Sequence, residues 1–108
     1  MTVEKILGQF DAFKSNEIED HVKVAWLCDV EGKILCDVYG LNADDLSLPK
    51  GGRDELTLPE SYSRVYLLYM AAMTELLKGN MDAYSRIMSE YRSALSSFAR
   101  YYIRNRKK

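Results

Sequence analysis

The clearest hydrophobic pattern lies in the second half of the chain. Apolar side chains recur there at alternating steps of four and three residues, the spacing of one face of a helix. Pro59 suits the start of a helix, Gly79 suits its end, and Asn80 suits the cap of the next helix. The pattern predicts helices over residues 59–78 and 81–104 that fold back on each other as an antiparallel αα-hairpin. The seam consists of Tyr62, Tyr66, Tyr69, Met73 and Leu76 in the first helix, and of Tyr84, Met88, Tyr91, Leu95, Phe98 and Tyr102 in the second.

A shorter amphipathic pattern opens the chain. Ile6, Leu7, Phe10 and Phe13 fall on one side of a helix, and Thr2 stands where an N-cap is expected. These positions predict a helix over residues 2–13.

The next segment fits a long helix. Apolar residues recur at every fourth position over residues 18–38. Asn16 followed by Glu19 resembles an N-cap with an acidic residue at the third helical position. This pattern predicts a helix over residues 17–39 that ends at Gly40.

A β-hairpin is the competing prediction for the same segment. Residues 22–30 also alternate, Glu31 and Gly32 could form a two-residue turn, and residues 34–38 could return as a second strand. The first strand would lack a polar face, because Ala25 and Leu27 occupy the alternate positions. We therefore favour the helix, although the pattern alone leaves both structures open.

Residues 40–57 form the predicted connection to the C-terminal hairpin. Glycines, an asparagine and Pro49 interrupt any regular pattern there. Residues 46–48 and 56–58 are matching Leu-polar-Leu alternations that could pair as a very short β-hairpin. The sequence thus predicts a mainly α fold, a small bundle of about four helices with a long loop before the hairpin, in a single domain over residues 1–108.

The composition supports one folded domain. Hydrophobic residues make up 47% of the 108 residues, too many for a disordered chain. No run approaches the roughly 18 consecutive apolar residues that cross a bilayer. The N-terminal stretch contains acidic residues and no small-residue cleavage site, so we expect no signal peptide and no membrane contact.

Charge is distributed unevenly along the chain. Residues 1–60 contain thirteen Asp or Glu and six Lys or Arg, a net charge of −7. Residues 61–108 contain three Asp or Glu and nine Lys or Arg, a net charge of +6. Such an asymmetry favours head-to-tail contact between copies, or a basic face that meets an anionic partner.

No set of residues in the sequence predicts an enzyme. His21 stands without a Ser or Cys nucleophile in a recognisable turn, so a solvated histidine is expected. Cys28 and Cys36, if they share a helix, lie about 12 Å apart, too far for a disulfide. A single histidine and the lack of a CxxC motif leave no zinc ligand set, and the acidic pairs lack EF-hand spacing. We expect no cofactor and no metal.

The tyrosines and the basic C-terminal end are the candidates for interaction. Tyrosines number eight, and those on the seam either pack with hydroxyls reaching water or form a protein–protein surface, where Tyr and Arg are enriched. The basic end, residues 100–108, has three alternative interpretations. It is a solvated terminus, it contacts DNA phosphates, or it docks into an acidic site of a neighbouring subunit.

Several motifs follow one another in a characteristic order and spacing. They are Lys23-Val24-Ala25-Trp26-Leu27, Val30-Glu31-Gly32-Lys33-Ile34, the segment Asp54-Glu55-Leu56-Thr57-Leu58-Pro59-Glu60-Ser61-Tyr62, and then Tyr66, Tyr69, Ala72, Gly79 and Tyr84. Together these motifs resemble the small head-tail connector (head-completion or adaptor) proteins of tailed bacteriophages and of prophages of Gram-positive bacteria. The resemblance covers about residues 16–104, and the chain differs from the family at Ser85, where the family often has Asn.

The resemblance implies a structural role without catalysis. Proteins of this family resemble wedges that assemble into a ring of about a dozen copies under the portal, extend the DNA channel and dock the next neck or tail protein. It also implies a helix over residues 17–39. The implied location is the neck of the virion, after synthesis in the cytoplasm of the bacterial host. The implied partners are further copies, the portal protein, a downstream neck or tail protein and, non-specifically, the packaged DNA.

A small nucleic-acid-binding regulator that uses the basic last helix is the alternative function.

The connector hypothesis selects two sets of residues. The candidate partner interface consists of Leu46, Leu48, Leu56, Leu58, Tyr62, Tyr66 and Tyr101. The candidate contacts with the DNA channel or the portal are Arg100, Arg104, Arg106, Lys107 and Lys108.

Overall fold

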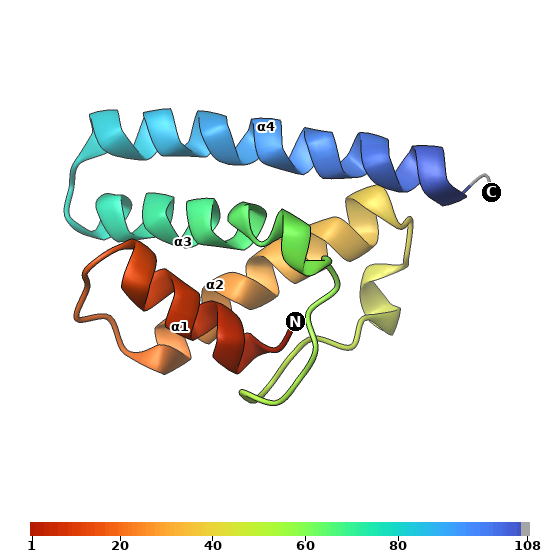
Figure 1. Ribbon diagram of the computed structural model, residues 1–108, viewed down its shortest axis with the longest axis horizontal. Coiled ribbons are helices and arrows are strands. Elements are labelled where there is room, and N and C mark those ends of the chain that lie inside the picture. Colours follow the sequence, from red (N-terminus) through yellow and green to blue (C-terminus); the bar gives the residue numbers. More distant parts are fainter. Residues whose placement is uncertain (107–108) are drawn as a thin grey trace.

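The computed structural model describes residues 1–106 as a bundle of helices (Figure 1). Within these residues the α-helices are α1 (Val3–Phe13), α2 (Asp20–Lys33), α3 (Arg64–Leu77) and α4 (Met81–Arg106), and no β-strand forms. In Figure 1, α4 runs along one long side of the molecule with α3 beside it, and α1 and α2 lie on the other side of α3. The prediction of a mainly helical fold with four helices is confirmed.

Helix α1 begins at the predicted cap. The hydroxyl of Thr2 accepts a hydrogen bond from the N–H of Lys5 at 3.2 Å, which satisfies a first-turn donor. Val3, Ile6 and Phe10 are buried. Of the predicted apolar face, Ile6 and Phe10 belong to the core and Leu7 is half-buried, whereas Phe13 is exposed at the end of α1.

Helix α2 decides between the two predictions for residues 22–38. The segment is helical, and the β-hairpin is wrong. Trp26, Leu27, Val30 and Ile34 are all buried. A helix places these residues on one side, whereas a strand would divide them between two faces. The helix continues through a π-helical turn, η1 (Ile34–Val38), and ends just before Gly40, whose φ is 74°.

The predicted cap of α2 is wrong. The helix begins at Asp20, and Asn16 lies outside it. The Asn16 side chain instead accepts a hydrogen bond from the N–H of Ile18 at 3.1 Å and donates one to the carbonyl of Lys14 at 2.9 Å. An asparagine that binds the backbone two residues further on competes with helix formation, so these residues form a connection.

Helix α3 also begins later than predicted. Pro59 precedes a single 3₁₀ turn, η3 (Glu60–Tyr62), and the α-helix starts only at Arg64. Gly79 follows its end with a φ of 76°. At the start of α4, the side-chain oxygen of Asn80 accepts a hydrogen bond from the N–H of Ala83 at 3.4 Å. The chain reverses at this turn, and α4 returns along α3 (Figure 1).

Helix α3 is the centre of the bundle, because it packs against α1, α2 and α4. More than half of its residues are buried, on several sides of the helix, as expected for an element that other helices surround. The buried residues of α3 are Val65, Tyr66, Leu68, Met70, Ala71, Ala72, Thr74 and Glu75.

The short hairpin proposed within the loop does not form. The loop contains one 3₁₀ turn, η2 (Ala43–Asp45), and its second leucine pair runs beside the N-terminus instead. The N–H of Leu56 donates to the carbonyl of Met1 at 2.8 Å, and the N–H of Val3 donates to the carbonyl of Asp54 at 3.0 Å. The first N–H groups of a helix have no acceptor within it, so the loop supplies acceptors that α1 lacks.

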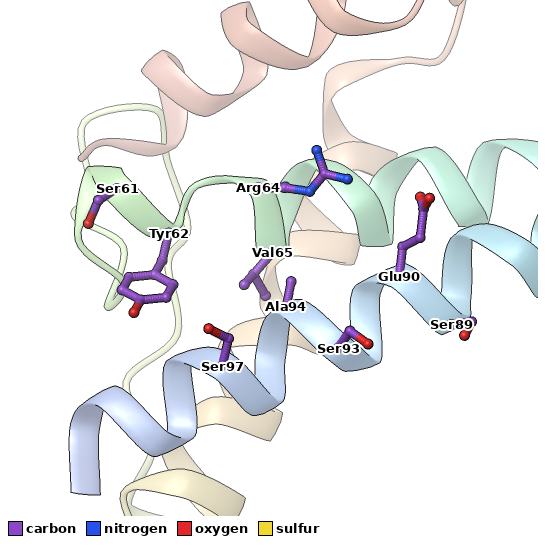
Figure 2. A pocket seen from close by; sticks show the side chains of 9 residues that line it. All are labelled: Ser61, Tyr62, Arg64, Val65, Ser89, Glu90, Ser93, Ala94 and Ser97. Carbon is purple, nitrogen blue, oxygen red and sulfur yellow. The ribbon is translucent and has the colours of Figure 1, made fainter. Parts of the chain in front are cut away.

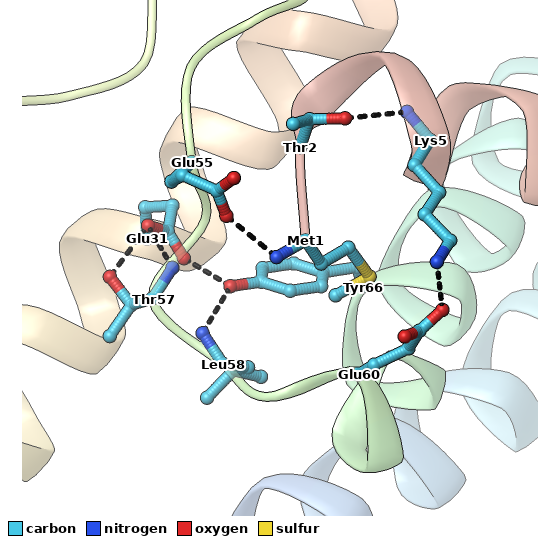
Figure 3. Close-up of polar contacts among 9 residues, drawn as sticks. All are labelled: Met1, Thr2, Lys5, Glu31, Glu55, Thr57, Leu58, Glu60 and Tyr66. Carbon is cyan, nitrogen blue, oxygen red and sulfur yellow. Dashed lines mark hydrogen bonds and ion pairs between the residues drawn. The ribbon is translucent and has the colours of Figure 1, made fainter.

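The end of the loop is fixed to the core by the buried carboxylate of Glu31 (Figure 3). This α2 residue is 2% exposed. One carboxylate oxygen accepts hydrogen bonds from the N–H of Thr57 at 3.0 Å and from its hydroxyl at 2.7 Å. The other accepts from the hydroxyl of Tyr66, which itself accepts from the N–H of Leu58 at 3.0 Å. No cation pairs with this carboxylate among residues 1–106, so hydrogen bonds alone compensate its burial.

The Tyr66 hydroxyl keeps its proton in this network. Burial, and then the adjacent Glu31 charge, raise the pKa of Tyr66 well above its usual value. The hydroxyl is therefore a donor to Glu31 over the whole physiological pH range.

Replacing Tyr66 with Phe tests this network. The change leaves one Glu31 oxygen and the N–H of Leu58 without partners in a buried site. Because each stranded group costs about 1–3 kcal/mol, we expect the free energy of unfolding in urea to fall by roughly 3 kcal/mol. Tyr62→Phe is the matched control, since its hydroxyl makes no hydrogen bond within residues 1–106, and it should change the value by less than about 0.5 kcal/mol. Equal losses in the two variants would contradict the assignment.

Two glycines should respond to alanine in opposite directions. Gly79 has a φ of 76°, which a side chain disfavours, so Gly79→Ala should lower the free energy of unfolding by about 1 kcal/mol. Gly8 lies inside α1, and a Cβ there would meet no atom within 4 Å. Gly8→Ala should therefore raise the free energy by roughly 0.5–1 kcal/mol. Thermal unfolding of both variants checks the pair, and a shift of the same sign in both would refute it.

Candidate interaction surface

Three residues of the predicted partner interface belong to the core. Leu56 is 6% exposed, Leu58 is 1% exposed, and Tyr66 has no exposed surface. The network around Glu31 turns this part of the chain inward, so these side chains are not available to a partner. The prediction that these three residues contact a partner is therefore wrong. The alternation of residues 56–58 did not reveal the tertiary contacts that bury them.

Tyr62 and Tyr101 are half-buried in an aromatic cluster near the C-terminal end of α4. Their ring centroids lie 5.3 Å apart, and the Phe98 ring meets Tyr62 edge to face at 5.2 Å. Tyr39, which follows η1, stacks on Tyr102 with centroids 4.2 Å apart. Offset and edge-to-face pairs of this kind stabilise a packed contact. The cluster holds α4 against η3 and the end of η1, and leaves the outer sides of Tyr62 and Tyr101 accessible.

The first leucine pair of the loop lies against α2. Leu46 and Leu48 are half-buried, and Pro49 is buried. The carbonyl of Pro49 accepts a hydrogen bond from the thiol of Cys28 at 3.2 Å. Burial raises the pKa of the Cys28 thiol, so it remains protonated and is a poor nucleophile. Of the predicted loop residues, Leu46 and Leu48 retain partly exposed surface for a partner.

A groove of about 510 Å³ opens between α4 and the start of α3 (Figure 2). Figure 2 shows the charged ends of Arg64 and Glu90 directed to the same side, while Ser93 and Ser97 line the α4 wall. Arg64 and Glu90 form no ion pair with each other among residues 1–106. Hydroxyls and one charge of each sign suit a polar contact with a protein. The lining residues are Ser61, Tyr62, Arg64, Val65, Ser89, Glu90, Ser93, Ala94 and Ser97.

The predicted basic residues that the structure describes are exposed on α4. Arg100, Arg104 and Arg106 all face solvent, whereas Lys107 and Lys108 lie outside the described residues. A second hollow, of about 410 Å³, contains Arg100 and four residues that sequence reasoning missed. The available signal was the repeat of Ser and Arg at helical spacing along residues 89–100. We call this site the α4 hollow, and it consists of Ser89, Arg92, Ser93, Ser96 and Arg100.

The remaining reactive side chains do not converge. His21 is exposed and lies beside Glu19, with 3.1 Å between the Nδ1 and Oε2 atoms. Cys28 and Cys36 are both free thiols. Within residues 1–106, no group of three or more His, Cys, Asp or Glu side chains is placed to hold a metal ion. In that same part of the chain, no helix is long and apolar enough to cross a membrane.

The chain matches no protein-family model, no curated protein and no solved structure.

Asp54 gives the loop a testable dependence on pH. Its carboxylate accepts hydrogen bonds from the N–H groups of Lys50 at 2.7 Å and Gly51 at 3.0 Å, and these bonds lower the pKa of Asp54. Its stabilising contribution is therefore complete above the unfolded pKa of about 3.9 and is lost as the pH falls through the lower folded pKa.

The variant Asp54→Asn removes this charge and keeps an acceptor. We expect its melting temperature to lie below that of the wild type at pH 7, and the difference to shrink toward zero as the pH falls through the lowered pKa of Asp54 in the folded protein. Asp45→Asn is the control, because the Asp45 carboxylate accepts no hydrogen bond within residues 1–106. A difference for Asp54→Asn that persists undiminished in acid would show that the charge is not the cause.

Proposed function

We propose that the protein is a structural subunit of a bacteriophage neck, a head-tail connector or adaptor. The observation that carries the proposal is that separate surfaces of one helical body carry opposite charge. The exposed arginines lie along α4, and the acidic turn Ala43–Asp45 lies in the loop below η1 (Figure 1). A subunit that joins different neighbours requires such distinct surfaces.

In this role the antiparallel αα-hairpin of α3 and α4 is the rigid body. The extensive packing of α4 on α3, and of α3 on α1 and α2, supports this assignment. The loop over residues 40–57 and the basic end of the chain are the partner-facing parts. Their exposed charged residues and the half-exposed Leu46, Leu48, Tyr62 and Tyr101 support contacts with proteins.

The proposed assembly is a ring of about a dozen copies under the portal. The ring would extend the DNA channel and dock a downstream neck or tail protein, within virions assembled in the bacterial host cytoplasm. Arg100, Arg104 and Arg106 are the described candidates for contact with the portal or, non-specifically, with packaged DNA. The order of motifs from Lys23 to Tyr84 that resembles connector proteins supports this choice among structural roles.

A small nucleic-acid-binding regulator is the second candidate. The exposed arginines of α4 favour it, because arginines along one helix face can neutralise DNA phosphates. Such a regulator would bind free duplex DNA with a steep dependence on salt, whereas a connector subunit would bind free DNA poorly and associate with a portal ring.

A co-assembly experiment separates the two functions. The purified chain is mixed with portal rings from the same phage or prophage, and separately with duplex DNA, at several salt concentrations. We expect it to sediment with the portal and to leave the mobility of DNA in a gel unchanged at physiological salt. A chain that shifts DNA and does not associate with portal would contradict the connector function.

A further inference from the structure

The α4 hollow lies on the side of α4 that faces away from the bundle. Tyr91 and Phe98 are buried against α3 and its neighbours. At 100° per residue, Ser89, Ser96 and Arg100 point in nearly the opposite direction, and all three are exposed. No other element of the described chain lines this hollow, so it is a free surface of α4.

The side chains of the hollow are suited to an anion. Arg92 and Arg100 line it together with three serines, and Ser93 and Ser96 lie between the two arginines along the helix. Arginine keeps its charge at any physiological pH, and its planar fork of donors matches a carboxylate. Neither guanidinium forms an ion pair within residues 1–106. The hollow therefore offers positive charge and donors that the described part of the protomer does not use.

The turn Ala43–Asp45 carries the matching charge. Asp44 and Asp45 are exposed, and neither carboxylate forms an ion pair within the described part of the chain. The turn has a defined conformation, because the side chain of Asn42 accepts a hydrogen bond from the N–H of Asp44 at 3.2 Å. Two adjacent carboxylates are thus presented together on a fixed backbone.

The hollow and the turn cannot meet within one protomer. The hollow lies on the outer face of α4, whereas the turn lies below η1, on the side of α4 that faces the bundle (Figure 1). A second copy can bring its turn to the hollow. Arg92 and Arg100 are eight residues apart, about 12 Å along the helix, which leaves room for two neighbouring carboxylates between them.

We infer that the α4 hollow of one copy binds Asp44 and Asp45 of the next copy. This inference rests on the proposed function and names the surfaces through which neighbouring subunits meet. The two surfaces differ, so the contact is heterologous and repeats from copy to copy, and it closes into a ring if the rotation between copies permits. The contact is electrostatic and exposed at its rim, so salt weakens it.

The chain itself favours a protein carboxylate over DNA as the anion. Duplex DNA is a long polyanion that would extend along α4 beyond the hollow. The exposed carboxylate of Glu90 lies at the edge of the same face. Repulsion from this carboxylate opposes DNA more than it opposes two aspartates that enter a hollow lined by arginines.

A charge exchange between two variants tests the inference. Variant one is Arg92→Glu with Arg100→Glu, and variant two is Asp44→Lys with Asp45→Lys. Self-association of the full chain is measured by sedimentation at low salt. Each variant alone should self-associate about tenfold or more weakly than the wild type, because like charges then meet at every contact.

An equimolar mixture of the two variants should recover assembly. In an alternating array, the glutamates of variant one meet the lysines of variant two, and the unchanged arginines and aspartates meet at the next contact. Arg53→Glu with Lys78→Glu is the matched control, because it makes the same change in net charge at exposed positions outside the hollow and should assemble like the wild type. Circular dichroism verifies the fold of each variant.

Three results would overturn the inference. One is a wild-type chain that stays monomeric at its highest soluble concentration and low salt. Another is a mixture that fails to assemble although both variants fold. The third is a variant one that self-associates normally and loses binding to duplex DNA, which would assign the hollow to nucleic acid. A monomeric wild type would overturn this contact between copies without deciding the connector function. The separate co-assembly experiment with the portal decides that function.

Discussion

The buried carboxylate of Glu31 joins the two halves of the chain. A charge in the core without a cation is tolerated only when hydrogen bonds replace its hydration, and here they come from Thr57 and Tyr66. The first is in the loop and the second in α3, so α2, the loop and α3 share one polar centre. This requirement fixes where the loop returns to the core, and it sets the backbone of Leu58 against the Tyr66 hydroxyl.

The position of α4 follows from that arrangement. Helix α3 is covered by α1 and α2 on its other sides, and α4 packs mainly on α3, with aromatic contacts to η3 and the end of η1. With 26 residues, α4 is about 39 Å long, close to the 42 Å length of the whole molecule. A helix of this length, buried along only one side, presents a continuous outer face. Arginines and serines on that face, together with the acidic turn Ala43–Asp45 below η1, give the protomer two surfaces of opposite charge.

The sequence predicted the parts of this fold that depend on local signals. Apolar spacing identified the helices, and Thr2, Gly40 and Gly79 marked where the chain enters or leaves them. The prediction of an N-cap at Asn16 was wrong because its side chain bonds the local backbone of Lys14 and Ile18. Other misses depend on partners distant in sequence. From sequence, Glu31 suited the turn of a β-hairpin, and only the folded chain shows that it is the acceptor for Thr57. The alternation of residues 56–58 suited one strand of a short hairpin, and its burial beside Glu31 is likewise visible only in the folded chain. The α4 hollow was missed because surface serines carry no periodic apolar signal.

We propose that the two charged surfaces of this helical body meet different neighbours in a ring of copies within a phage neck. An electron-microscopy reconstruction of the assembled neck tests this proposal most directly. We expect a ring of this chain beneath the portal, with the outer face of α4 in each copy against the turn Ala43–Asp45 of the next. A neck without this chain, or a ring in which α4 faces only the DNA while the acidic turns face solvent, would contradict it.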